Sequence, residues 1–327
     1  MTDNIFTYFL VALLTFCATV LLVKNLIPIF RRSAKQPIYE GGPSWHIAKS
    51  GTPTMGGVGF CVPIIIIGLS SVLLLQILGN KRAALTLFIS LIFALVNALI
   101  GFIDDITKLR HRENKGLSAK EKLFLQSSAV VFYLFARAFF LDAKTQIDFF
   151  SYSFDLGFFY YPLLAFILVG IINCANLTDG IDGLATSVAF SVGVSLFYYT
   201  FARFAASSFI CALLIGATVG FLIFNAQPAK IFMGDTGSLF LGALVCSCAL
   251  ESGGIISVIS VSTVYILEGI SVVLQVIIFK ATKKRLFKMA PLHHHLEKSG
   301  WSECKICIAA IFITLLSSLF GAFAFAV

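Results

Sequence analysis

Residues 83–108 read AALTLFISLIFALVNALIGFIDDITK, an apolar run that ends abruptly at two adjacent carboxylates, Asp104 and Asp105. The run is long enough to cross a bilayer as a helix, which needs about 20 predominantly apolar residues. Two adjacent carboxylates repel each other and resist losing their hydration, so a positive group must compensate them. Lys108 is one candidate for that group, and a divalent cation is the other. Taken alone, the pattern also fits an ordinary ion pair at a helix end.

The composition excludes a water-soluble protein. Of the 327 residues, 58% are hydrophobic, 12% are charged and 34 are phenylalanine, which is more apolar surface than a soluble core can bury. We therefore expect an all-α, polytopic integral membrane protein that forms a single domain over residues 1–327. The net charge of +8 is explained more simply by basic loops that face an anionic leaflet than by nucleic-acid binding.

Ten apolar runs, separated by charged or polar residues, predict ten transmembrane helices. They cover residues 5–30, 54–79, 83–104, 120–141, 157–175, 184–203, 206–225, 238–257, 259–280 and 304–327. Most of the 24 lysines and arginines follow odd-numbered spans. Because loops rich in lysine and arginine tend to stay in the cytoplasm, both termini are expected outside. The lean loop at 142–156 is then external, and we expect it to be a short amphipathic segment.

Most of the aspartates also follow odd-numbered spans, which places them at the same face of the membrane as the basic loops. They follow spans three, five and seven as Asp104, Asp105, Asp179, Asp182 and Asp235. Random placement would scatter them over both sides of the membrane. We therefore expect an active site at the cytoplasmic face.

The sequences of two of these loops are compatible with binding of phosphate or Mg²⁺. Residues 176–183 read NLTDGIDG, a turn whose glycines allow close backbone approach and which can present Asn176, Asp179 and Asp182 to a bound group. A tight turn with solvated aspartates is the alternative. Residues 234–238 read GDTGS before an apolar helix, where free N–H groups favour phosphate and Asp235 could bind Mg²⁺. A helix cap made by Thr236 or Ser238 explains the same letters.

Three of the five histidines form one run, in the sequence PLHHHLE at 291–297. Three consecutive histidines cannot all face one metal on a regular helix, so hydrogen bonding to phosphate or sugar hydroxyls fits better than catalytic zinc. Glu268 and Gln275 are seven residues apart in span nine, hence on one helical face that could line a cavity. Residues 49–57, KSGTPTMGG, form a polar glycine-rich turn, which is a weak signal by itself.

Together these motifs resemble the polyprenyl-phosphate N-acetylhexosamine-1-phosphate transferases, and the likeness covers nearly the whole chain. Other branches of that superfamily share the aspartates, whereas the triple-histidine run and the GTPTMGG turn resemble the phospho-N-acetylmuramoyl-pentapeptide transferase branch. The motifs, in order, are GTPTMGG (51–57), DDITK (104–108), NLTDGIDG (176–183), FMGDTGS (232–238) and PLHHHLE (291–297).

The resemblance implies a Mg²⁺-dependent homodimer in the inner (cytoplasmic) membrane of a bacterium. It implies transfer of phospho-N-acetylmuramoyl-pentapeptide from UDP-N-acetylmuramoyl-pentapeptide to undecaprenyl phosphate, which gives lipid I and UMP in peptidoglycan biosynthesis. Asp104 and Asp105 match the family's aspartate pair and Asp235 its metal ligand, so these three are the expected catalytic residues. The expected substrate contacts are Lys49, Thr54, Lys108, Asn176, Asp179, Gly180, Asp182, Asn225, Phe232, Gly234, Ser238, Gln275, His293, His294 and His295.

Two other functions fit parts of the pattern. A sibling enzyme would use UDP-N-acetylglucosamine instead. A secondary transporter would also be polytopic, but its critical polar residues should lie near mid-span. Here the aspartates lie at span ends, which favours interfacial catalysis, and Glu268 alone fits the transporter pattern. The sequence leaves open which of Asp104 and Asp105 acts as base, and whether an enzyme-bound intermediate forms.

Overall fold

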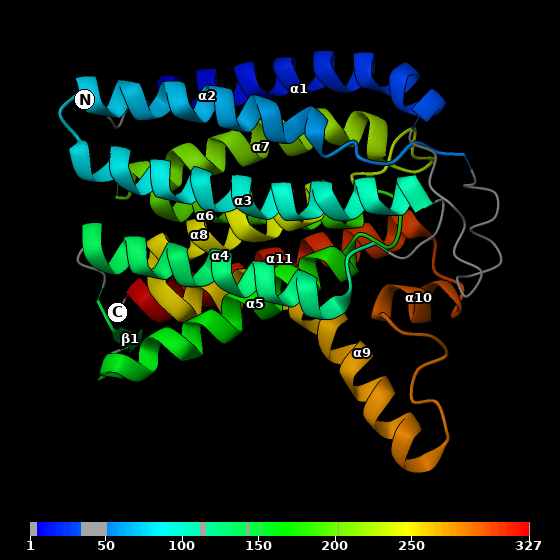
Figure 1. The fold of residues 1–327 in the computed structure, drawn as a ribbon. Coiled ribbons are helices and arrows are strands. Elements are labelled where there is room, and N and C mark those ends of the chain that lie inside the picture. The colour runs from blue at the N-terminus through cyan, green and yellow to red at the C-terminus, as the bar shows by residue number, and fades with distance from the viewer. Residues whose placement is uncertain are drawn as a thin grey trace.

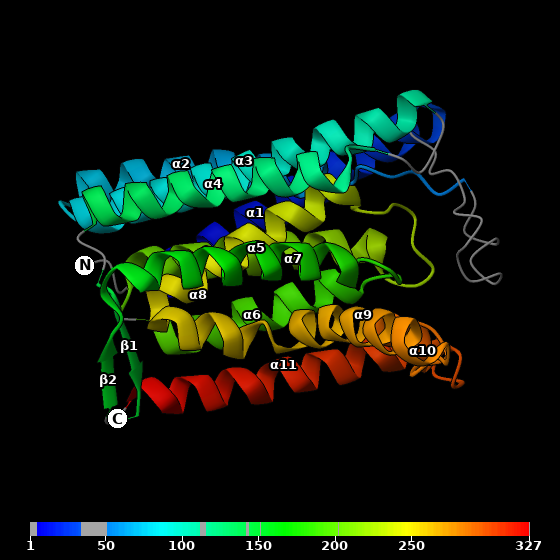
Figure 2. The same ribbon diagram turned by 60° about the horizontal axis from the view of Figure 1, so that its bottom comes forward.

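The computed structural model describes residues 5–33, 51–111, 116–141, 144–150, 152–201 and 203–326. They form one bundle of roughly parallel and antiparallel helices, with a small hairpin across one end (Figures 1 and 2). The helices are α1 (Ile5–Ser33), α2 (Val58–Ile77), α3 (Lys81–His111), α4 (Ala119–Phe140), α5 (Tyr160–Thr178), α6 (Leu184–Thr200), α7 (Ala205–Asn225), α8 (Gly234–Val261), α9 (Thr263–Thr282), α10 (Leu292–Glu297) and α11 (Glu303–Ala326). The hairpin consists of β1 (Gln146–Phe149) and β2 (Tyr152–Asp155), and the 3₁₀ turn η2 (Gly157–Phe159) leads from it into α5.

The prediction of an all-helical, polytopic membrane protein is confirmed. Within the described residues, nine helices are long and apolar enough to cross a membrane, and α6 is a shorter apolar helix. Successive spans alternate in direction, so α1 begins and α11 ends at the same end of the bundle, remote from the end of α3 that carries the carboxylates (Figures 1 and 2). The side of the membrane that each end faces stays a prediction.

Helix α8 forms the centre of the bundle and is the most deeply buried of the described spans. It packs most extensively against α3 and also lies against α5 and α11. The glycine, alanine, serine and cysteine residues in its first half allow this close helix packing, as small residues do in membrane bundles. The helix kinks at Gly253 and Gly254, and the φ of +65° at Gly254 is a left-handed conformation that favours glycine.

Gly101 allows the closest approach of α3 to α8. A Cβ at this position would overlap the backbone carbonyl of Asp235. We expect Gly101→Ala to lower the free energy of unfolding by about 1–3 kcal/mol, the usual cost of overpacking a tight contact. Thermal unfolding of the purified protein in detergent measures the effect.

Gly170 in the middle of α5 supplies the matched control, because a Cβ there would meet no heavy atom within 4 Å. Gly170→Ala should leave stability unchanged or raise it by up to about 1 kcal/mol, since alanine favours helix more than glycine does. Equal melting temperatures for the two variants would contradict the proposed packing of α3 on α8.

Helix α9 diverges from the bundle as it leaves α8, and the short α10 lies beside it (Figure 1). Several apolar side chains of α9 are exposed, among them Ile270, Val273 and Ile277. Such a surface is stable only against lipid or another apolar partner. The connection between α9 and α10 lies at the same end of the molecule as the carboxylates, beside the bundle and not within it (Figure 1).

Candidate active site

The two adjacent aspartates of α3 are both buried, and they face different partners. Asp104 and Asp105 are 2% and 4% exposed, respectively. Oδ2 of Asp104 lies 2.7 Å from Nζ of Lys108, one helical turn later in α3. Asp105 instead turns toward the start of α8. The expected Asp104–Lys108 ion pair is therefore present, but it involves only one member of the aspartate pair.

Asp105 caps the N-terminus of α8. Its Oδ1 accepts a hydrogen bond from the backbone N–H of Asp235 (3.1 Å), and its Oδ2 accepts from the N–H and the hydroxyl of Thr236 (2.9 and 2.6 Å). A carboxylate at this place satisfies unpaired N–H groups and complements the positive end of the helix dipole. The prediction of amides free for phosphate is therefore wrong for Asp235 and Thr236. The alternative of a cap made by Thr236 or Ser238 is also wrong, because a carboxylate from another helix accepts these bonds.

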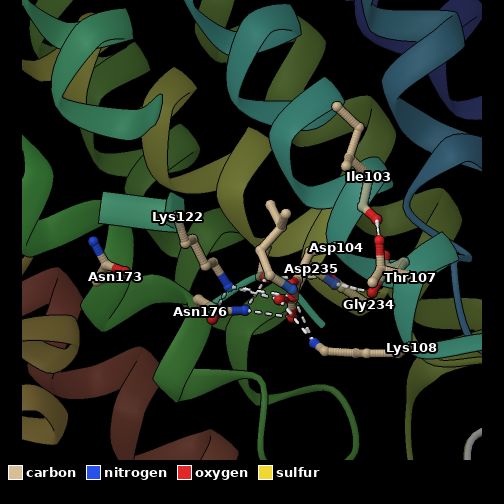
Figure 3. A network of polar contacts seen from close by, with 12 residues as sticks. Ile103, Asp104, Thr107, Lys108, Lys122, Asn173, Asn176, Gly234 and Asp235 are labelled. Carbon is tan, nitrogen blue, oxygen red and sulfur yellow. Dashed lines mark hydrogen bonds and ion pairs between the residues drawn. The ribbon is translucent and has the colours of Figure 1, made fainter. Parts of the chain in front are cut away.

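Asp235 is the centre of a polar network (Figure 3). Its Oδ2 lies 3.0 Å from Nζ of Lys108 and 2.6 Å from Nζ of Lys122. Its Oδ1 accepts a hydrogen bond of 2.9 Å from the side-chain amide of Asn176, and the same amide donates to Oγ of Ser238 at 2.8 Å. Side chains from α3, α4, α5 and α8 thus converge at one end of the bundle, as the span parity predicts.

Lys122 also belongs to this network, although it was not among the site residues predicted from the sequence. Besides Asp235, it contacts Oδ1 of Asn176 at 3.1 Å and lies 3.7 Å from Oδ2 of Asp104. The start of α4 fixes its position: Ser118 and Glu121 form a reciprocal capping box, and the N–H of Leu117 donates to Asp104 at 2.6 Å. The Ser-x-x-Glu sequence of this capping box, directly before Lys122, is the signal that could have placed Lys122 in the first turn of a helix.

The glycine-rich turn at 51–57 packs against the segment that precedes α8. The N–H of Phe232 donates to the carbonyl of Pro53 at 2.8 Å, and the N–H of Gly56 donates back to the carbonyl of Phe232 at 2.8 Å. A Cβ on Gly234 would lie 3.0 Å from Oγ1 of Thr54. Thr54, Phe232 and Gly234 are therefore brought together beside the aspartates. Lys49 lies outside the described residues.

The turn after α5 divides into two parts. Burial, together with the charges of Asp235, Asp105 and Asp182, raises the pKa of the Asp179 carboxyl well above its ordinary value. The expected contact of Asp179 with substrate stays a prediction. Asp182 is oriented differently, because its Oδ2 accepts from the N–H of Ala229 at 2.8 Å while its own N–H donates to the buried Glu303 at 2.9 Å.

Asn225, at the end of α7, has partners within the chain for both ends of its side chain. Its Oδ1 accepts from the hydroxyl of Thr186 at 2.8 Å, and its Nδ2 donates to the carbonyl of Ile231 at 3.1 Å. It is 1% exposed. Asn225 and Asp182 thus hold the 226–231 connection in place, and their expected contact with substrate stays a prediction.

His293 packs the start of α10 against the turn after α5. Its ring is completely buried, and its Nδ1 lies 3.1 Å from Oε2 of Glu268, which also accepts from the backbone N–H of His293 at 3.2 Å. A Cβ on Gly180 would overlap Nε2 of this histidine, so the glycine is required for the two segments to meet. Glu268 therefore faces the protein interior, as its place in an apolar span predicts.

The remaining predicted residues fold the α9–α10 connection. Oε1 of Gln275 accepts from the N–H groups of Leu286 and Phe287 at 3.1 and 2.9 Å. Nδ1 of His294 lies 2.6 Å from Oε2 of Glu297, and Nδ1 of His295 accepts from the N–H of Lys288 at 3.1 Å. The three histidines therefore have three different surroundings, and their expected contact with substrate stays a prediction.

The residues fit a Mg²⁺ ion held partly by a ligand. Within the described part of the chain, no three His, Cys, Asp or Glu side chains are grouped to hold a metal ion. Mg²⁺ commonly takes only one or two carboxylates and completes its shell with water and substrate phosphates. Asp104 and Asp235 contact the same two ammonium groups, so their carboxylates lie close enough together to share in holding one cation.

Comparison with known proteins agrees with this chemistry. The sequence profile of glycosyl transferase family 4 matches residues 59–253, and a signature of phospho-N-acetylmuramoyl-pentapeptide-transferase matches residues 49–61. A protein of that name from Halalkalibacterium halodurans is 40% identical over 315 residues, which is 95% of each chain. Proteins of the same name from Staphylococcus carnosus and Clostridioides difficile are 38% and 37% identical over 96% and 93% of this chain, and over 98% and 94% of their own.

Proposed function

Because the chain belongs to glycosyl transferase family 4 and to the phospho-N-acetylmuramoyl-pentapeptide transferases, we propose that it transfers phospho-N-acetylmuramoyl-pentapeptide from its UDP carrier to undecaprenyl phosphate. The products are lipid I and UMP. The observation that carries the proposal is the network around Asp235, which combines carboxylates and ammonium groups at one end of an apolar bundle. A lipid anchored in the bilayer presents its phosphate at that level.

Lys108 and Lys122 bind the phosphates of the two substrates. Both ammonium groups contact Asp235 and have Asp104 within 3.7 Å, so they are already held in one place before a ligand arrives. Charged groups fixed in advance stabilise developing negative charge without reorganisation during the reaction. The side chain of Asn176 contacts both Lys122 and Asp235, and so it fixes the start of α4 relative to the start of α8.

Asp104 is the better candidate for the base that orients or deprotonates the lipid phosphate. It faces Lys108 and Lys122, where an anionic substrate would lie, and general bases must be within reach of the proton that they take. The carboxylate oxygens of Asp105 instead accept hydrogen bonds from the backbone N–H of Asp235 and from the hydroxyl of Thr236. Asp105 is therefore a positioning residue for α8.

Asp235 would hold the Mg²⁺ ion, with Asp104 beside it. When bound, Mg²⁺ screens the charges of the diphosphate and stabilises UMP as it leaves. In the structure, Oδ2 of Asp235 holds both ammonium groups, at 3.0 Å from Lys108 and 2.6 Å from Lys122. The homodimer that the family resemblance implies stays a prediction.

Turnover by the purified protein tests the proposed reaction. UDP-N-acetylmuramoyl-pentapeptide and undecaprenyl phosphate together should release UMP, and omitting either one should abolish the release. UDP-N-acetylglucosamine should give no UMP at the same enzyme concentration. Efficient use of that sugar would identify the sibling enzyme, whereas substrate flux across proteoliposomes without UMP release would identify a transporter.

A further inference from the structure

The β1–β2 hairpin has one apolar face and one polar face. The strands pair in the register Ile147 with Phe154 and Phe149 with Tyr152. Because side chains alternate between the two faces of a strand and paired residues share a face, these four side chains lie together. The other face carries Gln146, Asp148, Ser153 and Asp155. On it, Ser153 donates to Asp148 at 2.7 Å, and Thr145 donates to Asp155 at 2.5 Å.

The apolar face is turned toward the ends of the membrane spans. β1 packs against α8 and α11, and Ile147 joins the edge of the apolar core. The hairpin crosses the end of the bundle that is remote from the carboxylates (Figure 2). The polar face, with its two carboxylates, consequently points away from the bundle.

On β2, the apolar face of the hairpin is not covered by the helices. Tyr152 and Phe154 are 69% and 58% exposed, although they share a face with the half-buried Ile147. Phe158 and Phe159 of η2 and Phe166 of α5 are exposed as well. η2 leads directly from β2 into α5, a helix long and apolar enough to span the membrane. A side chain that continues the outer surface of a spanning helix meets the same surroundings as that helix, namely lipid.

The backbone sets the depth of the hairpin in the membrane. Among the described residues the sheet has two strands, so each strand has an edge whose N–H and C=O groups have no strand partner in that part of the chain. Such groups are not tolerated in hydrocarbon, whereas water and headgroups satisfy them. Tyrosine and other aromatic side chains are enriched at that level of the bilayer. The only environment that suits both the apolar face and the open edges is the boundary between headgroups and acyl chains.

We propose that the β1–β2 hairpin is an interfacial anchor, whose apolar face lies in the headgroup–acyl boundary of the bilayer at the end of the bundle opposite the carboxylates. Its partner is the lipid interface. Because the outward face carries Asp148 and Asp155, the contact does not depend on anionic headgroups. The anchor is independent of the reaction proposed above.

Tryptophan fluorescence in liposomes tests the anchor. The full chain is used with both native tryptophans, Trp45 and Trp301, replaced by phenylalanine. Phe154→Trp then reports on the apolar face, and the neighbouring Ser153→Trp reports on the polar face. The vesicles contain zwitterionic phosphatidylcholine brominated either close to the headgroup or deep in the chain.

Phe154→Trp should give blue-shifted emission, stronger quenching by the shallow bromines than by the deep ones, and little quenching by aqueous iodide. Ser153→Trp should show the opposite pattern, with iodide as the effective quencher. Tyr152→Trp, on the same face as Phe154, replaces the first variant if that protein does not fold. UMP release equal to that of the parent protein verifies the fold of each variant.

Three results would overturn the proposal. Quenching of Phe154→Trp by iodide as strong as that of Ser153→Trp would show that the face is in water. Stronger quenching by the deep bromines would place it in the hydrocarbon core. Protection from both bromine and iodide would show that a second copy or another protein covers it.

Discussion

Replacing Asp235 by asparagine is expected to lower the rate of UMP release by about 10³-fold, which corresponds to about 4 kcal/mol of activation free energy. Asparagine keeps the shape of the side chain but removes the charge that Lys108 and Lys122 share at 3.0 and 2.6 Å. It also removes the carboxylate proposed to bind Mg²⁺. The decrease should persist at saturating concentrations of both substrates, and added Mg²⁺ should not restore the rate.

The fold of Asp235→Asn should survive, because Asp104 remains 2.7 Å from Lys108 and 3.7 Å from Lys122. Asp148→Asn, in the hairpin at the other end of the bundle, removes the same charge from an exposed position and serves as the matched control. It should retain the parent rate. Turnover of Asp235→Asn within a few-fold of the parent would refute the metal assignment.

The sequence predicted the meeting of Asp104, Asn176 and Asp235 because the lengths of the apolar runs dictate where each helix reaches the edge of the membrane, although α3 continues to His111 and α8 already begins at Gly234. A span of about 20 residues leaves little freedom in the position of its polar end. Residues directly after odd-numbered spans must therefore share a face of the bundle. This physical constraint is strong, which is why charged residues far apart in the sequence could be grouped without knowing how the helices pack.

The same reasoning could not assign a partner to each side chain at that end. Lys122 is one of several lysines in a basic stretch. The capping box of Ser118 and Glu121 fixes where α4 begins, but which lysine then faces Asp235 depends on how α4 packs against the other helices. The loop at 142–156 was predicted to be an amphipathic segment, and the hairpin was not predicted. Its turn contains Phe150 with a φ of 52°, a conformation that phenylalanine seldom adopts, so the local sequence does not indicate a turn there. Its pairing depends on packing against α8 and α11, which local sequence does not encode.

The division of work between Asp104 and Asp105 leads to the second large effect. Asp105→Asn should lower both the melting temperature and the turnover number, whereas Asp104→Asn should lower mainly the turnover number. At position 105, asparagine would keep one acceptor oxygen but would place its NH2 group against either the N–H of Asp235 or the N–H of Thr236, which now donate to the two carboxylate oxygens. Losing charge-assisted hydrogen bonds in this buried position costs about 1.5–3 kcal/mol each.

Asparagine at position 104 can still accept from the N–H of Leu117. It loses the ion pairs with Lys108, which is 29% exposed, and with Lys122, but both lysines keep Asp235 as a partner. The stability cost of Asp104→Asn is therefore expected to be at most about 1 kcal/mol. Thermal unfolding and steady-state kinetics on both variants separate the two effects. Thr236→Val removes one of the three donors to Asp105 and should reproduce part of the loss in melting temperature, while Thr236→Ser retains the hydroxyl and should not. If Asp105→Asn unfolded at the parent temperature yet lost turnover, Asp105 would act on the substrate and not as the cap of α8.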